Sequence, residues 1–346
     1  MRIALLTDKI STGGGLEHIY QLCAGMPDMQ FGVFGQPGDA NGKFDKLANV
    51  ELVLSNDKAA VDRFAPDLVH YHHLKPLARL GSPAGRKLFT VHGVHLHRYE
   101  FQRGARPALE RFARLTLERT LYRRIDRMIT VSAEDAAYLR QHHGCDSTTI
   151  YNGIDFAPIE AVTASKTGLR ARLGLPQDKS LYLMVARFDF PKGHDVLVRA
   201  IAAMKQQGTL GARLFVLAGD GALMGPTRAL ADSLGVSEHI LFLGTRRDVY
   251  ELMTASDVFV LPSRWEGLPI TLIEALVARV PAVASRTYGI ATVARETGSN
   301  VGLFENENPD DLARALAAPP SFQSCSLDMF RLQAMIDATR KVYLEA

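Results

Sequence analysis

The chain has 346 residues, 47% hydrophobic and 22% charged, which is ordinary for a globular protein and long enough for two domains. Its net charge of +3 favours no class of partner, so local clusters matter more. The three cysteines are odd in number and widely spaced, which argues against a disulfide framework and for a reducing compartment. No apolar run approaches the roughly 20 residues of a membrane span, and the N-terminus resembles a strand rather than a signal peptide. We therefore expect a cytoplasmic protein.

Short apolar runs alternate with helical patterns, which predicts α/β domains with parallel sheets. The first series of predicted strands covers 2–7, 31–35, 50–54, 67–73, 86–93 and 127–133. The second covers 180–187, 212–221, 239–244, 257–263, 280–285 and 301–305. A stretch without strong periodicity separates them, from Phe156 to Gln177. We predict an N-terminal domain over 1–157, a linker over 158–176, a C-terminal domain over 177–326 and a terminal helix over 327–346.

Three glycines, Gly13, Gly14 and Gly15, follow the first predicted strand and precede a helix from Leu16. Glycines let a backbone approach a ligand closely, and a helix N-terminus offers N–H groups to an anion. The spacing is neither the Rossmann nor the Walker pattern, so a flexible tight turn is the alternative interpretation.

Histidines gather around the predicted strands 67–73 and 86–93. By number they could suggest a metal site, yet no cysteine and no carboxylate triad accompanies them in the sequence. We therefore expect no metal. The set consists of His70, His72, His73, His92, His95 and His97.

Two carboxylates flank Pro269, a residue suited to the start of a helix. Glu266 lies in the loop after the strand 257–263, at the strand end where α/β sheets bind ligands. Glu274 lies in an apolar helix, where a carboxylate needs a partner. The two suit a ligand that carries hydroxyls and an anion, such as a nucleotide sugar. The alternative is a solvated Glu266 and a Glu274 paired to a distant arginine.

The run Glu266-Gly267-Leu268-Pro269, followed by Glu274-Ala275-Leu276, resembles the signature of retaining glycosyltransferases of family 4. The aromatic residue that many members have after the glycine is absent here. The resemblance implies the GT-B fold, with two Rossmann-like domains facing across a cleft and the C-terminal helix crossing back to the first domain. It also implies that Glu266 meets the donor sugar and Glu274 the nucleotide ribose.

The same resemblance assigns further roles. Arg187 and Lys192 would grip the donor diphosphate and stabilise the leaving group, whereas without it both would be read as solvated surface cations. His92 would approach the donor sugar, so the catalytic candidates are His92, Arg187, Lys192 and Glu266. The donor-binding candidates are Gly14, Gly15, Arg187, Lys192, Gly219, Gly221, Thr245, Arg246, Glu266, Gly267, Leu268 and Glu274. The acceptor-side candidates are Gly13, His70 and His72, the two histidines being either near the acceptor or merely packed. No cofactor is expected, because the nucleotide sugar is a substrate.

The segment Arg98–Arg127 carries nine arginines against four acids. One interpretation is an amphipathic helix from Pro107 that packs on the first domain, with Leu109, Phe112, Leu121 and Ile125 as its apolar stripe. The other is peripheral docking on an anionic membrane, to reach a lipid-linked acceptor. Nucleic acid binding is not expected, because stacking aromatics and a recognised motif are absent.

We therefore predict a retaining hexosyltransferase that moves a sugar, favoured to come from a UDP-sugar, to an acceptor hydroxyl. The acceptor would be a saccharide or a lipid-linked acceptor. The reaction would serve the synthesis of a polysaccharide, lipopolysaccharide or glycolipid, at the inner face of the plasma membrane. The alternatives are a GT-B epimerase of nucleotide sugars and a non-catalytic relative that binds them. The presence of Arg187, Lys192, Glu266 and Glu274 counts against the non-catalytic relative.

Overall fold

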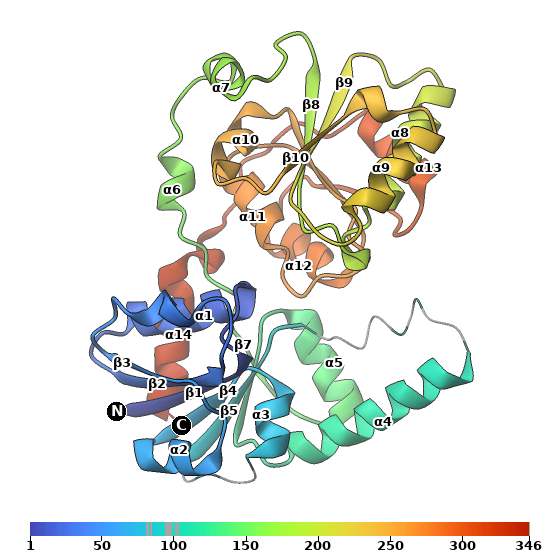
Figure 1. The fold of residues 1–346 in the computed structure, drawn as a ribbon. Coiled ribbons are helices and arrows are strands. Elements are labelled where there is room, and N and C mark those ends of the chain that lie inside the picture. The colour runs from blue at the N-terminus through green and yellow to red at the C-terminus, as the bar shows by residue number, and fades with distance from the viewer. Residues whose placement is uncertain (81–82, 84, 94–98, 100, 102–103, 346) are drawn as a thin grey trace. The chain divides into compact units, whose positions relative to one another are not determined.

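A computed structural model describes residues 1–80, 83, 85–93, 99, 101 and 104–345. The chain forms two compact units. The N-terminal unit consists of Met1–Gly153 and Met329–Ala346, and the C-terminal unit of Ile154–Asp328. Each is an α/β unit with one sheet (Figure 1). All the strand pairs described are parallel, as the alternating pattern predicts.

The N-terminal sheet has seven strands in the order β3-β2-β1-β4-β5-β6-β7. The six predicted strands are present, and β7 is an addition too short to be read from a pattern. Their bounds are β1 (Arg2–Lys9), β2 (Gln30–Gln36), β3 (Val50–Val53), β4 (Leu68–Tyr71), β5 (Arg86–Val91), β6 (Arg127–Thr130) and β7 (Thr148–Thr149).

Helices cover both faces of this sheet, because successive side chains of a strand point to opposite faces. Ile3 and Leu5 pack with α1 (Gly14–Gly25) and α14 (Leu332–Glu345). Ala4 and Leu6 belong to the cluster on the other face. That face is covered by α2 (Lys58–Phe64), α3 (Leu74–Arg79), α4 (Ala105–Tyr122) and α5 (Ala133–His143). A short 3₁₀ helix, Asn41–Phe44, packs with the cluster of α1 and α14 through Phe44.

The C-terminal sheet has six strands in the order β10-β9-β8-β11-β12-β13. Every predicted strand of this half is present. The bounds are β8 (Ser180–Val185), β9 (Arg213–Ala218), β10 (Ile240–Gly244), β11 (Val258–Leu261), β12 (Ala282–Ser285) and β13 (Gly302–Phe304). One face packs on α8 (His194–Gln206), α9 (Met224–Ser233) and α13 (Pro309–Ala317). The remaining helices are α10 (Val249–Ala255), α11 (Ile270–Val277) and α12 (Tyr288–Thr297), with 3₁₀ turns at Phe190–Lys192, Ser237–His239 and Asp328–Phe330.

The stretch expected as a linker over 158–176 is part of the C-terminal unit, which corrects that prediction. It contains α6 (Ala157–Glu160) and α7 (Lys166–Leu173). Arg170 of α7 is buried, donates to the backbone oxygen of Ala255 and forms an ion pair of 2.6 Å with Asp257. These partners lie far away in sequence, so local periodicity could not reveal that α7 packs on the domain.

The last helix, α14, packs in the N-terminal unit, which is the return that the resemblance implies. His70 on β4 helps to hold it there. This histidine is fully buried, with Nδ1 2.8 Å from the Tyr343 hydroxyl and Nε2 2.7 Å from the Thr90 hydroxyl. Both ring nitrogens are therefore bonded within the unit. These contacts show the packing role, and a place of His70 beside the acceptor stays a prediction.

The basic segment forms α4 over its central part, while Arg98, Glu100, Gln102 and Arg103 lie outside the described residues. The predicted apolar stripe is only half packed. Leu121 joins the core, but Leu109 and Phe112 are 69% and 67% exposed. None of the described helices combines the length and apolarity that crossing a membrane requires.

Candidate functional site

In each sheet the strand order reverses next to the first strand of the unit. The reversal lies between β1 and β4 in the N-terminal unit and between β8 and β11 in the C-terminal unit. Open α/β sheets bind ligands beyond the carboxyl ends of the strands at such a point. The predicted site residues follow these strands: Gly13–Gly15 follow β1, Lys192 follows β8 and Glu266 follows β11.

Lys192 and Glu266 form an ion pair at the C-terminal switch point. The Lys192 ammonium lies 2.8 Å and 2.9 Å from the two carboxylate oxygens of Glu266. The Ser263 hydroxyl donates to the same carboxylate at 2.6 Å. Because β8 and β11 are neighbours, residues that are 74 positions apart meet at one edge of the sheet. The structure thus joins two predicted site residues and adds Ser263, which the sequence analysis missed.

Arg264 holds the loop that carries Lys192. Its guanidinium is buried and pairs with Asp195 at 2.8 Å and Glu307 at 2.5 Å. It also donates to the backbone oxygen of Phe190, and its own backbone N–H donates to Pro191. No local pattern predicts this residue, because its partners come from two distant segments, 190–195 and the one that carries Glu307. Its position directly after a strand, beside Glu266, was the available signal.

We expect Arg264→Ala to destabilise the C-terminal unit by about 2–3 kcal/mol. Removing one partner of a buried ion pair costs about 3–5 kcal/mol. We expect a loss at or just below the lower end of this range, because Asp195 and Glu307 are each nearly half exposed and can be hydrated once Arg264 is removed. Urea unfolding followed by circular dichroism measures the change. Arg314→Ala, at an exposed pair with Asp311, is the control and should change stability by less than about 1 kcal/mol. Equal losses in both variants would contradict the role of Arg264.

Two glycine positions in these loops are set by packing. A Cβ at Gly219 would lie 2.0 Å from the Ala186 backbone oxygen, and one at Gly193 2.0 Å from that of Pro262. Both residues also have a positive φ, which favours glycine. Gly221 is similar, since its Cβ would lie 2.6 Å from the Phe188 oxygen. Close packing of the loops therefore explains Gly219 and Gly221, and their contact with a nucleotide remains a prediction.

The two arginines predicted at the donor site both have carboxylate partners. Arg187 is 81% exposed at its side chain and lies 2.6 Å from Asp189. Arg246 donates to both oxygens of Asp248, at 2.8 Å and 2.5 Å, while Thr245 is exposed. Asp248 precedes α10, so the pair ties the loop to the start of that helix.

Glu274 lies on α11 and its partner is a tyrosine rather than an arginine. The Tyr250 hydroxyl, from α10, donates to its carboxylate at 3.1 Å. Burial raises the pKa of Glu274 to about 7, and the hydrogen bond from Tyr250 lowers it by less. Tyr250 carried no recognisable signal in the sequence. The nearby Leu268 is buried, and Gly289 of α12 approaches the Gly267 oxygen too closely for a Cβ.

The glycine loop of the N-terminal unit differs from those of the C-terminal unit. Among the residues that the structure describes, a Cβ at Gly13 or Gly14 would meet nothing within 4 Å, and one at Gly15 would make only an ordinary contact with His73. Packing therefore does not require these three glycines. This absence of a packing reason supports the expectation that a ligand approaches the loop. Glu17, on the following helix, pairs with Lys43 at 2.8 Å.

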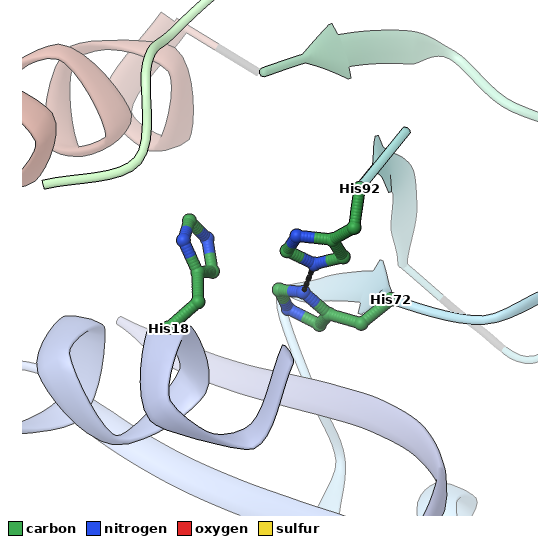
Figure 2. Close-up of side chains that lie close together, drawn as sticks. All are labelled: His18, His72 and His92. Carbon is green, nitrogen blue, oxygen red and sulfur yellow. Dashed lines mark hydrogen bonds between the residues drawn. The ribbon is translucent and has the colours of Figure 1, made fainter. Parts of the chain in front are cut away.

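Three histidines meet beside this loop: His18 from α1, His72 after β4 and His92 after β5 (Figure 2). His72 Nδ1 lies 3.0 Å from His92 Nε2. Burial lowers the pKa of His18 to about 4, and a hydrogen bond with the Asn152 side chain raises that pKa by a smaller amount. Burial, and then the neighbouring histidines, lower the pKa of His72 well below its usual value. These two rings are therefore neutral at pH 7.

Local pattern predicts His72 and His92 at neighbouring strand ends, but it assigns no role to His18. The approach of His18 depends on how α1 packs on the sheet, which local sequence does not encode. His95 and His97 lie outside the described residues. Of the other predicted histidines, His72, His73 and His92 border a cavity of about 270 Å³ in the N-terminal unit.

Comparison with known proteins relates both halves of the chain to one group of enzymes. Residues 165–318 match the family described as Glycosyl transferases group 1, and residues 12–157 match Glycosyltransferase Family 4. EpsD of Bacillus subtilis (strain 168), named as a glycosyltransferase, is 30% identical over 274 residues, which cover 75% of this chain and 68% of EpsD.

Two further proteins are informative. The UDP-Gal:alpha-D-GlcNAc-diphosphoundecaprenol alpha-1,3-galactosyltransferase of Escherichia coli is 29% identical over 64% of this chain and 58% of its own length. The crystal structure of HepE from Anabaena, in complex with UDP and glucose, superposes with a TM-score of 0.79 at 20% identity and full coverage of both chains. This likeness confirms the fold predicted from the sequence. The chain therefore belongs to the group 1 glycosyl transferases and has the GT-B fold.

Proposed function

We propose that the protein is a retaining glycosyltransferase that moves a sugar from a nucleotide sugar, favoured to be a UDP-sugar, to an acceptor hydroxyl. The observation that carries the proposal is the Lys192–Glu266 pair at the switch point between β8 and β11. The Lys192 ammonium has three N–H groups. Two of them donate to Glu266, so the third can donate to a phosphate of the nucleotide sugar. The carboxylate can accept from sugar hydroxyls. The complex of HepE with UDP and glucose supports the same class of donor.

The proposed reaction needs no dedicated general base. The acceptor oxygen attacks the anomeric carbon on the face from which the nucleoside diphosphate departs, so the configuration is retained. The bond between that carbon and the phosphate oxygen breaks, and a donor phosphate oxygen takes the acceptor proton. Arg187 and Lys192 would stabilise the negative charge that grows on the diphosphate. Because these cations supply that stabilisation, we propose that the reaction requires neither a metal nor a cofactor.

The N-terminal unit would bind the acceptor. Among the described residues nothing packs where a Cβ of Gly13 would lie, and His72 borders the cavity described above. The galactosyltransferase of Escherichia coli acts, by its name, on a sugar linked to diphosphoundecaprenol. A saccharide or lipid-linked acceptor, in polysaccharide or lipopolysaccharide synthesis at the cytoplasmic face of the membrane, is therefore the acceptor class that we propose.

A thermal-shift panel with UDP, GDP, ADP and their sugar conjugates tests the donor. A ligand at about 100 times its dissociation constant adds about 2.7 kcal/mol of stability, enough to shift the melting temperature by several degrees. We expect the uridine compounds to give the largest shift. No shift with any nucleotide would contradict the proposal. Binding without transfer to any acceptor would identify a non-catalytic relative, and conversion of the donor alone would identify an epimerase.

We also propose that α4 docks on an anionic membrane. Leu109 and Phe112 are exposed on the same half of the helix as Arg106 and Arg111. Exposed apolar side chains among arginines match an anionic lipid surface, because the apolar groups enter the interface and each nearby cation adds about 1 kcal/mol.

We expect the wild-type protein to co-sediment with anionic liposomes and much less with neutral ones. Burial of an apolar side chain of this size is worth about 1.5–3 kcal/mol, so Leu109→Ser with Phe112→Ser should weaken binding by about tenfold or more. Leu223→Ser, at an exposed leucine of the C-terminal unit, is the matched control and should bind as the wild type does. Equal, negligible binding to both kinds of liposome would exclude the membrane role.

A further inference from the structure

His18, His72 and His92 form a compact cluster of imidazoles in the N-terminal unit. One ring nitrogen from each lies within 4.8 Å of the other two. His72 Nδ1 and His92 Nε2 are 3.0 Å apart, and the ring of His18 meets that of His92 edge-on, with 4.9 Å between the ring centres. Figure 2 shows the three side chains converging from different segments of the chain. The cluster is therefore a property of the fold rather than of a local motif.

The burial of the cluster bears on metal binding. His18 and His72 are 5% and 3% exposed, so their rings are removed from bulk water. Burial also leaves His18 Nδ1 without a hydrogen-bond partner among the described residues. His72 Nε2 lacks one too, but His72 would bind an ion through Nδ1, the nitrogen that faces His92, so the ion would not satisfy Nε2. A buried polar atom without a partner is costly and calls for an explanation.

We propose that His18, His72 and His92 bind one divalent transition-metal ion of the zinc type. Three imidazoles are a known ligand set for Zn²⁺, whereas Mg²⁺ and Ca²⁺ prefer oxygen ligands. Each nitrogen of a tetrahedral zinc site lies about 2.0–2.1 Å from the metal, which places two such nitrogens about 3.3 Å apart. The observed 3.0 Å between His72 and His92 is close to that spacing, so an ion could replace the hydrogen bond between the two rings. A ring nitrogen of His18 lies within 4.8 Å of both and would be the third ligand.

An ion has a route to this site. His72 and His92 line the cavity of about 270 Å³, so an ion could reach the cluster through this cavity. With three protein ligands, the fourth position of a tetrahedral ion would be left to water or to an anion.

A bound ion would also compete with the contact to the donor sugar that the resemblance implies for His92. Its ring nitrogen cannot ligate a metal and contact the donor sugar through the same atom. The metal would therefore act as an inhibitor of a reaction that itself needs none. This consequence rests on the proposed function, whereas the metal binding does not.

Isothermal titration of Zn²⁺ into the full-length, metal-stripped protein tests the site without donor or acceptor. Co²⁺ serves as a second probe, because its visible absorption reports a four-coordinate environment. We expect one ion per wild-type chain. His18→Ala should weaken the affinity by more than about tenfold, since losing even an outer-shell partner of a metal ligand costs about 10–100-fold. His239→Ala, at a histidine of the C-terminal unit, is the control and should bind as the wild type does.

Two results would overturn the proposal: no binding of Zn²⁺ to the wild type, or equal affinities for the wild type and His18→Ala. His18→Gln guards against a folding defect, because it keeps a polar group near Asn152 while removing the ring, and it should lose affinity as His18→Ala does. Circular dichroism of each variant verifies its fold. Since the titration contains no nucleotide, its outcome is independent of whether the protein transfers a sugar.

Discussion

Lys192→Ala is expected to lower kcat by about 10²–10³-fold, while the affinity for the donor falls much less. Lys192 would stabilise charge that grows on the diphosphate as the glycosidic bond breaks. Loss of one hydrogen-bond donor that stabilises such charge in a preorganised site typically lowers kcat by about 10²–10³-fold. Its ion pair with Glu266, at 2.8 Å, holds the ammonium in place before the donor arrives. Initial rates with donor and acceptor both saturating measure the effect.

The matched control for this experiment is Lys205→Ala. Lys205 is a half-exposed lysine of α8 that contacts Glu238 and the Gly235 backbone oxygen, away from the strand-end loops. Its removal should leave kcat unchanged. Lys192→Ala should also depress turnover more than Glu274→Ala, which is expected to act mainly on donor binding. A turnover near that of the wild type in Lys192→Ala would show that its assignment is wrong.

Nucleotide affinity is expected to rise about tenfold between pH 6 and pH 8. The pKa of Glu274 is raised to about 7 by burial, so the side chain changes from mostly protonated to mostly ionised across this interval. The ionised carboxylate accepts hydrogen bonds from both ribose hydroxyls, whereas the protonated form has less acceptor capacity. Isothermal titration of the proposed nucleotide at the two pH values measures the change.

Glu274→Gln should bind more weakly at pH 8 and lose this dependence on pH. Glu251→Gln replaces a carboxylate on the neighbouring helix α10, which pairs with Arg172, and should keep the dependence. A wild-type affinity that does not vary over this interval would exclude ionised Glu274 as the ribose ligand.

The same shift has a consequence for the stability of the protein without nucleotide. The pKa of Glu274 is higher in the folded than in the unfolded chain, so the folded state binds the proton more tightly. Its contribution to stability is complete below the unfolded value of 4.5 and is lost as the pH rises through about 7. The loss is about 3 kcal/mol at most. The protein thus keeps an unfavourable carboxylate in α11, a cost that a ligand with hydroxyl donors would offset.

Local pattern was enough to predict the strands of both sheets and the placement of Arg187, Lys192 and Glu266 at strand ends. The reason is that strand and helix periodicities are encoded over a few residues, and parallel topology brings successive strand ends to one edge of a sheet. The signature around Glu266 and Glu274 also predicted the GT-B fold, which the superposition confirms. The linker over 158–176 was wrong, because an absence of periodicity does not reveal the long-range ion pair of Arg170.

Only the tertiary structure decided which partners these residues meet. Tyr250 rather than an arginine bonds Glu274, and Arg264 holds the loop of Lys192 through carboxylates from two other segments. His70 is bonded to a tyrosine 273 residues away, while His18 is brought to His72 and His92. Each of these contacts depends on how helices pack on a sheet. Packing is set by the sum of many side-chain contacts across the fold, so no local stretch of sequence contains it.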